Sequence, residues 1–131
     1  MAIAPQIVHF SGHGSGVNGI LVQDDDGMSK SISTEALAEL FGLCSDHIEC
    51  VLLNACYSEV QATAIAQHIN YVIGMSDAIG DSAAIKFTTG SYDALGAGRS
   101  IEVAFKFGCN AIHTENIPGH LIPTIKRKLQ D

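Results

Sequence analysis

Two residues that can carry covalent chemistry follow separate apolar runs of this chain. His13 lies in a glycine-rich turn after Ile7–Phe10, and Cys56 follows the longer run Cys50–Ala55. A thiol beside an imidazole forms a pair of nucleophile and general base. Open α/β sheets place their sites beyond the carboxyl ends of parallel strands. His13 and Cys56 are therefore a candidate catalytic pair if the two runs form neighbouring strands.

The elements that would position this pair alternate along the chain. Apolar runs predict strands over 7–10, 50–55, 71–75 and 110–113, and periodic or capped segments predict helices over 34–43, 59–69, 81–95, 101–108 and 118–129. An Asp-Gly turn predicts a β-hairpin between 20–23 and 29–32. The order predicts one α/β domain over residues 1–131, with a mostly parallel sheet and right-handed crossovers.

Further candidate residues fall at the same predicted edge of the sheet. Gly12 and Gly14 let the backbone turn sharply and leave a peptide N–H free to point at a substrate. Cys56 directly precedes a predicted helix, whose positive end favours a thiolate. Asp77 and Asp81 follow the third strand. They are either a turn residue and a helix cap, or acidic groups that attract a Lys or Arg side chain of a substrate.

Composition and charge exclude several classes of function. The 131 residues are 47% hydrophobic and 16% charged, which indicates a globular chain. A net charge of -7 argues against nucleic acid and anionic lipid as partners. No apolar run reaches the roughly 18 residues of a membrane span, and no signal-peptide pattern begins the chain. Four cysteines without a CxxC pair indicate reduced thiols in a cytoplasm, and no residue pattern predicts a metal or cofactor.

The residues around both apolar runs resemble clan CD cysteine peptidases, in particular the bacterial caspase-like CHAT domains. The resemblance rests on HFSGHG and NACYS, each at the end of an apolar strand. It continues through YVIGMSDAIGD, YDALGAG and GCNAIHTENIP and covers nearly the whole chain. It implies a caspase-like, haemoglobinase-type three-layer sandwich, with helices on both faces of the sheet and an inserted β-hairpin.

The resemblance also implies roles for single residues. His13 would be the general base and Cys56 the nucleophile, and the backbone N–H groups of Gly14 and Cys56 would bind the oxyanion. Metacaspases usually carry an acidic residue two positions before the nucleophile, where this chain has Asn54. Asn54 is therefore a candidate substrate-binding residue, but a preference for basic side chains does not carry over to it.

A second departure from the family concerns the start of the fold. Caspase-like domains usually have a strand, helices and another strand before the histidine-bearing strand, whereas only six residues precede Ile7 here. The resemblance thus implies that the N-terminal part of the fold is missing. Ile7–Phe10 would then lie at a sheet edge with unpaired backbone groups, which predicts a homodimer through that edge.

Two classes of function follow from these expectations. The leading hypothesis is a caspase-like cysteine endopeptidase that acts on a peptide or protein substrate. CHAT-like domains usually sit at the output end of larger sensor proteins, so we expect an effector domain with an upstream sensor domain or a regulatory partner. The alternative is a catalytically silent caspase-like scaffold, and an oxidation-sensing thiol is a third possibility.

Overall fold

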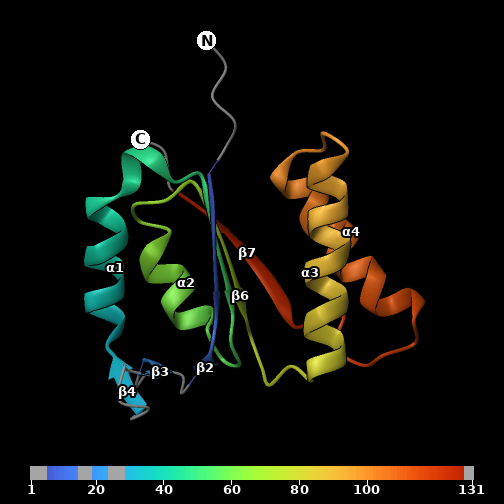
Figure 1. Cartoon of the computed structure of the whole chain (residues 1–131), viewed down its shortest axis with the longest axis horizontal. Coiled ribbons are helices and arrows are strands. Elements are labelled where there is room, and N and C mark those ends of the chain that lie inside the picture. Colours follow the sequence, from blue (N-terminus) through green and yellow to red (C-terminus); the bar gives the residue numbers. More distant parts are fainter. Residues whose placement is uncertain (1–5, 15–18, 24–28, 129–131) are drawn as a thin grey trace.

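The structure is a computed structural model that describes residues 6–14, 19–23 and 29–128 (Figure 1). Residues 13–14, 21–23 and 29–30 are described as backbone only. The predicted Asp-Gly turn of the hairpin lies outside the described residues.

A four-stranded sheet forms the middle layer. Its strands are β1 (Ile7–Ser11), β5 (Cys50–Asn54), β6 (Tyr71–Met75) and β7 (Pro123–Arg127), in that spatial order. The first three strands are parallel, and β7 pairs antiparallel with β6. Each residue of β5 from Cys50 to Leu53 is buried, as expected for a strand covered on both faces.

Helices cover both faces of this sheet (Figure 1). One face carries α1 (Thr34–Leu43) and α2 (Glu59–Ile65), and the other carries α3 (Asp81–Gly96) and α4 (Ile101–Thr114). A short 3-10 helix, η2 (Ser45–His47), precedes β5. This arrangement confirms the predicted three-layer α/β sandwich with a mostly parallel sheet.

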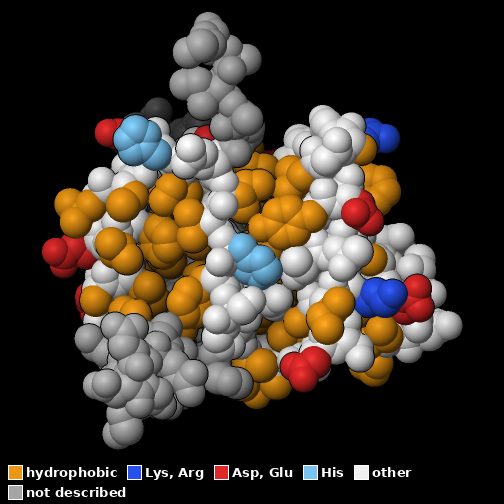
Figure 2. Space-filling view, viewed as in Figure 1, with side chains coloured by type: hydrophobic (Ala, Val, Ile, Leu, Met, Phe, Trp, Pro, Cys, Tyr) orange, Lys and Arg blue, Asp and Glu red, His pale blue; other side chains and the backbone are white. Residues whose placement is uncertain are grey.

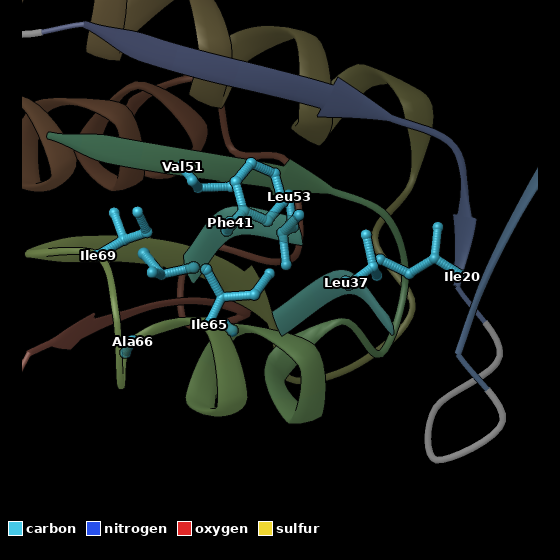
Figure 3. Close-up of a cluster of buried hydrophobic side chains, with 10 residues drawn as sticks. Ile20, Leu37, Phe41, Val51, Leu53, Ile65, Ala66 and Ile69 are labelled. Atoms are coloured by element: carbon cyan, nitrogen blue, oxygen red, sulfur yellow. The ribbon is translucent and has the colours of Figure 1, made fainter. Parts of the chain in front are cut away.

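Two apolar cores fill the spaces between the layers. In the first, Phe41 of α1 packs near Val51 and Leu53 of β5, with Ile65 of α2 completing the contact (Figure 3). In the second, Leu52 of β5 packs with Met75, Phe87 and Ile112 under α3 and α4. Successive residues of β5 thus serve opposite cores, because side chains alternate along a strand. This double burial fixes β5, and with it the start of the loop that carries Cys56.

A small antiparallel sheet follows β1. It contains β2 (His13–Gly14), β3 (Ile20–Gln23) and β4 (Ser29–Ile32), in the order β2-β3-β4. The predicted hairpin between 20–23 and 29–32 is confirmed, and β2 adds a third strand that the sequence did not predict. Ile20 is fully buried and lies beside Leu37 of the first core (Figure 3), so this sheet is anchored to α1.

Serine N-caps begin two of the helices, α1 and α4. Ser33 and Ser100 accept N–H bonds from Ala36 and Val103 at 3.1 and 3.2 Å, as N-cap residues do. The N-cap of α3 is Gly80, and Asp81 is the first helical residue rather than the cap. Helix α2 ends at Ile65, four residues before the predicted end.

The predicted strand at 110–113 is wrong, because these residues form the last turn of α4. The buried residues Ala104, Gly108 and Ile112 are spaced by four, so one helix face continues through the segment.

The predicted helix over 118–129 is also wrong. Residues Pro123–Arg127 form β7 at the edge of the sheet, and Pro123 is its first residue, where proline is tolerated. Lys126 pairs with Glu59 of α2 at 3.2 Å, and Arg127 pairs with Glu102 of α4 at 2.7 Å.

Strand β1 lies at the other edge of the sheet, as the sequence predicted. Within the described residues it pairs only with β5. Figure 2 views the molecule onto this edge and shows apolar side chains on both sides of β1. His9 is exposed there, 3.3 Å from the Ser11 hydroxyl and with its ring 6.0 Å from that of Tyr92. Its partial burial lowers the pKa of His9 below the ordinary value.

None of the helices that the structure describes is both long and apolar enough to cross a membrane.

Candidate active site

The strand register brings the two candidate segments to one edge of the sheet. Ser11 is the last residue of β1 and pairs with Asn54, the last residue of β5. His13 and Cys56 each come two residues after these paired strand ends. His13 begins β2 of the small antiparallel sheet, and Cys56 lies in the segment between β5 and α2. The candidate catalytic pair required β1 and β5 to be neighbouring strands, and the structure meets this requirement. The His13 side chain lies outside the described part of the structure, so the dyad stays a prediction, and oxyanion binding by the backbone N–H of Gly14 stays a prediction as well.

Cys56 is half-buried, and its sulfur lies against the loop between β6 and α3. The backbone N–H of Ile79 donates to Cys56 Sγ at 3.3 Å, and the thiol donates to the Ile79 carbonyl at 3.7 Å. All four cysteines are free thiols. The loop thus fixes where the sulfur sits.

The other thiols have different surroundings. Burial raises the pKa of Cys50 to about 12, with a smaller contribution from the charge of Glu49. Burial also raises the pKa of Cys109 to about 11. Both stay protonated at neutral pH and are poor nucleophiles there. Cys44 is exposed, so it offers an internal reference thiol for Cys56.

Ser58 ties the loop after Cys56 to the sheet, a role that the sequence analysis missed. Its buried hydroxyl donates to the Leu53 carbonyl at 3.1 Å and accepts the Met75 N–H at 3.0 Å. The ends of β5 and β6 are thereby joined through one side chain. A serine directly before a helix is typical of an N-cap residue, but the Ser58 side chain makes no capping hydrogen bond. The sequence around Ser58 therefore does not indicate its actual partners.

A groove of about 460 Å³ opens beside Cys56. It joins the carboxyl ends of β1 and β5 to the first turns of α3. Its lining residues are Ser11, Gly12, Asn54, Ala55, Cys56, Ile79, Asp81, Ala84 and Ile85. The structure therefore brings Cys56, Asn54 and Asp81 together, and Asp77 lies outside the lining.

Asn54 presents a hydrogen-bond acceptor at this groove. Its amide nitrogen donates to the Thr88 hydroxyl at 3.2 Å. Its Oδ1 atom is buried and has no partner among the described residues. Buried acceptors nearly always find a donor, so this oxygen is the one polar atom of the Asn54 side chain that still requires a partner. Substrate binding by Asn54 itself stays a prediction.

The two acidic residues of the β6–α3 segment have different surroundings. Asp81 is exposed in the first turn of α3, at the mouth of the groove. The Asp77 carboxylate accepts the Ala78 N–H at 2.7 Å, and its backbone carbonyl accepts the Tyr57 N–H at 3.2 Å. These bonds fit the turn interpretation of Asp77. Contact with a substrate stays a prediction for both residues.

Metal ligation has no support in the part of the chain that is described. Among those residues, no three His, Cys, Asp or Glu side chains lie close enough together to hold an ion. Among the described lining residues, the side chains with reactive or polar groups include the Cys56 thiol, the Asn54 amide and the Asp81 carboxylate.

Fold and groove together define an α/β sandwich with a thiol at the end of a central strand. No family model matches the chain. A curated relative, a Roc-COR-CHAT protease from an unknown prokaryotic organism, is 27% identical over 120 residues. The match covers 87% of this chain and 11% of the relative, so the chain spans about a tenth of that protein's length. The similarity supports a CHAT-like relationship and a possible peptidase.

Proposed function

We propose that the chain is a caspase-like cysteine endopeptidase module in which Cys56 and His13 cleave peptide bonds. One observation carries the proposal. The Cys56 thiol sits at a groove beyond β5, and the neighbouring parallel strand β1 leads directly to His13. The name of the curated relative, a CHAT protease, supports the same class.

The proposed reaction proceeds by acyl transfer. His13 takes the thiol proton, and Cys56 Sγ attacks the scissile carbonyl. The N–H groups of Gly14 and Cys56 stabilise the oxyanion, at about 3 kcal/mol for each donor. His13 then gives its proton to the leaving amine, and a thioester remains on Cys56. Water, deprotonated by His13, hydrolyses the thioester and restores the free thiol.

The groove favours a basic substrate side chain. Asp81 contributes an exposed carboxylate, and the described lining contains no Lys or Arg. Ala84 and Ile85 offer apolar surface for the methylene stem of a Lys or Arg residue. Asp77 would add negative charge from the adjacent loop.

A peptide electrophile that reacts with thiols tests the activity. A peptidyl ketone ending in Arg is added to the whole chain, and mass spectrometry follows the labelling of each cysteine. Cys56 should react at least tenfold faster than the exposed Cys44, and His13→Ala should abolish that advantage. Asp81→Asn should reduce the preference for Arg over Gln. Labelling of Cys56 no faster than Cys44, with no cleavage lost in Cys56→Ala, would refute the proposal.

The alternative function is that of a catalytically silent caspase-like scaffold. The observation that favours it is the edge position of β1, since the strand that leads to His13 pairs only with β5 in the described residues. A folded protein whose Cys56 and Cys44 label at equal rates would support this alternative. An oxidation-sensing thiol would instead show Cys56 reacting with peroxide but not with the peptide electrophile.

We also propose that the chain acts in the cytoplasm as the effector domain of a larger regulated bacterial system. The curated relative is about nine times as long as the matched segment, which leaves room for upstream domains in that protein. An upstream sensor domain or regulatory partner would then control the groove. Weak cleavage by this chain, increased by fusion to such a domain, is the expected behaviour.

The exposed β1 edge leads us to propose a homodimer. The Gln6 carbonyl accepts the Cys50 N–H, so alternate residues from Ile7 onward direct their backbone groups away from β5. A second copy of β1 could continue the sheet across a two-fold axis. Light scattering at micromolar concentration should give a dimer, and His9→Pro, which removes an N–H from the edge, should give a monomer. A monomeric parent chain with exchange-protected Ile7–Phe10 amides contradicts this proposal.

A further inference from the structure

The Cys56 sulfur makes two hydrogen bonds to the backbone of one residue, Ile79, in the β6–α3 loop. The Ile79 N–H donates to Sγ at 3.3 Å, and the Ile79 carbonyl accepts from the thiol at 3.7 Å. The shorter bond becomes stronger when its acceptor carries a negative charge. The longer bond exists only while the sulfur keeps its proton. Ile79 therefore presents a donor that serves the reactive, ionised form of Cys56.

Asp77 determines where this donor lies. Its backbone carbonyl accepts the Tyr57 N–H at 3.2 Å, which joins the loop to the residue directly after Cys56. Its carboxylate accepts the Ala78 N–H at 2.7 Å, which fixes the turn one residue before Ile79. Tyr57 adopts a left-handed backbone conformation with φ 58°, so the chain turns sharply at this junction.

The loop is also held on either side of Asp77. The Ser76 N–H and hydroxyl both donate to the Ile122 carbonyl at 3.0 Å. The Ile79 side chain packs on the second core, between the sheet and α3. The pKa of Tyr57 is raised, first because the Asp77 carboxylate accepts a hydrogen bond from its hydroxyl. Backbone and side chain of Asp77 thus both connect to the Cys56–Tyr57 segment.

We infer that Asp77 is a positioning residue, which holds the Ile79 N–H against Cys56 Sγ, where this donor can stabilise the negative charge that the sulfur acquires when it reacts. The inference rests on the proposed function only for calling Cys56 the nucleophile. Asp77 acts through the loop and makes no contact with the reacting atoms.

The rate of Cys56 alkylation by iodoacetamide, measured from pH 5 to 10 on the whole chain, tests this role. Iodoacetamide reacts with the thiolate, so the midpoint of the pH profile reports how readily the sulfur ionises. Asp77→Ala should slow alkylation at pH 7 about fivefold, the effect of losing one net hydrogen bond, and should move the midpoint to higher pH. Ile79→Pro, which removes the donor itself, should do the same. Asp77→Asn should restore the parent rate, because its amide oxygen can accept the Ala78 N–H.

Two control variants distinguish a change in the position of the Ile79 N–H from a general loss of order in the loop. Asp93→Ala removes an exposed acid from α3, outside this loop, and should leave the profile unchanged. Ile79→Val keeps the N–H while trimming the side chain, so it should follow the parent and not Ile79→Pro. Each variant is compared at equal folded fraction, as judged by its thermal unfolding curve. If Asp77→Ala unfolds, Tyr57→Phe removes only the hydroxyl bond to Asp77 and should move the midpoint in the same direction.

The outcomes also distinguish this inference from the proposed peptidase. An unchanged pH profile in folded Asp77→Ala and Ile79→Pro, or in Tyr57→Phe where Asp77→Ala unfolds, would overturn the positioning role, whatever the peptidase assay shows. A shifted profile in a chain that cleaves no peptide would uphold the positioning role and count against the peptidase alone.

Discussion

Replacing Ser58 by alanine should destabilise the protein more than any substitution of an exposed serine. The hydroxyl is fully buried, and its loss leaves both the Leu53 carbonyl and the Met75 N–H without this partner. Each unsatisfied buried group costs on the order of 1–3 kcal/mol, so we expect a loss of about 3 kcal/mol in the free energy of unfolding. For a chain of this length that corresponds to a fall of about 10 °C in Tm.

Urea denaturation followed by circular dichroism measures this loss directly. Ser82→Ala is the matched control, because Ser82 is exposed in the first turn of α3 and should change stability by less than about 0.5 kcal/mol. Alkylation of Cys56 in Ser58→Ala should also change, since the loop after Cys56 loses its tie to β6. A loss below about 1 kcal/mol, with an unchanged urea slope, would show that other groups satisfy Leu53 and Met75 and would refute the reasoning.

Two further predictions concern β6 and the buried thiols. Gly74→Ala should lower the free energy of unfolding by about 2 kcal/mol, because the added Cβ would lie 2.8 Å from the Ala62 Cβ and 2.9 Å from the Ser58 carbonyl oxygen. In Gly80→Ala the added Cβ meets no atom within 4 Å, so this variant should keep the stability of the parent chain. Thermal unfolding of the two variants checks this, and equal Tm values would contradict it. Burial raises the pKa of Cys50 to about 12, so its contribution to stability is present below about pH 9 and is lost as the pH rises toward 12. Urea midpoints should therefore fall more steeply between pH 9 and 11 for the parent than for Cys50→Ala, and parallel curves would count against the burial effect.

Apolar runs and helix caps in the sequence predicted those strands and helices whose residues carry a clear pattern of their own. The run Cys50–Asn54 lacks alternation because both faces of β5 are buried, and the capped stripe of α1 gave its bounds at Thr34 and Leu43. The adjacency of β1 and β5 was only a condition in the sequence analysis, because many residues separate the two strands along the chain. The structure supplies this adjacency, which places Cys56 beside the segment that carries His13.

The failures concern segments whose state depends on distant partners. Residues Pro123–Arg127 carry a weak pattern of their own, and their strand forms because β6 offers a free edge. Their charges gain partners on α2 and α4, which no sequence spacing could indicate. Ser58 was hidden for the same reason, since its hydroxyl accepts the N–H of Met75, 17 positions away. The sequence indicated Asp77 as a turn residue, but its bond to the Tyr57 N–H depends on the tertiary structure. Polar residues at strand ends therefore need the tertiary structure before a role can be assigned.

The fold itself selects one of the four thiols for chemistry at the groove. Cys50 lies inside the second core and Cys109 packs against it, and burial raises the pKa of each far above neutrality. Cys44 is exposed at the end of α1 with no groove assigned to it among the described residues. Cys56 alone combines access from a groove with a backbone donor on its sulfur. Because β5 is fixed by both cores, and Ser58 and Asp77 make bonds to the adjoining segments, the sulfur is held in place in the free protein, as the proposed covalent catalysis would require.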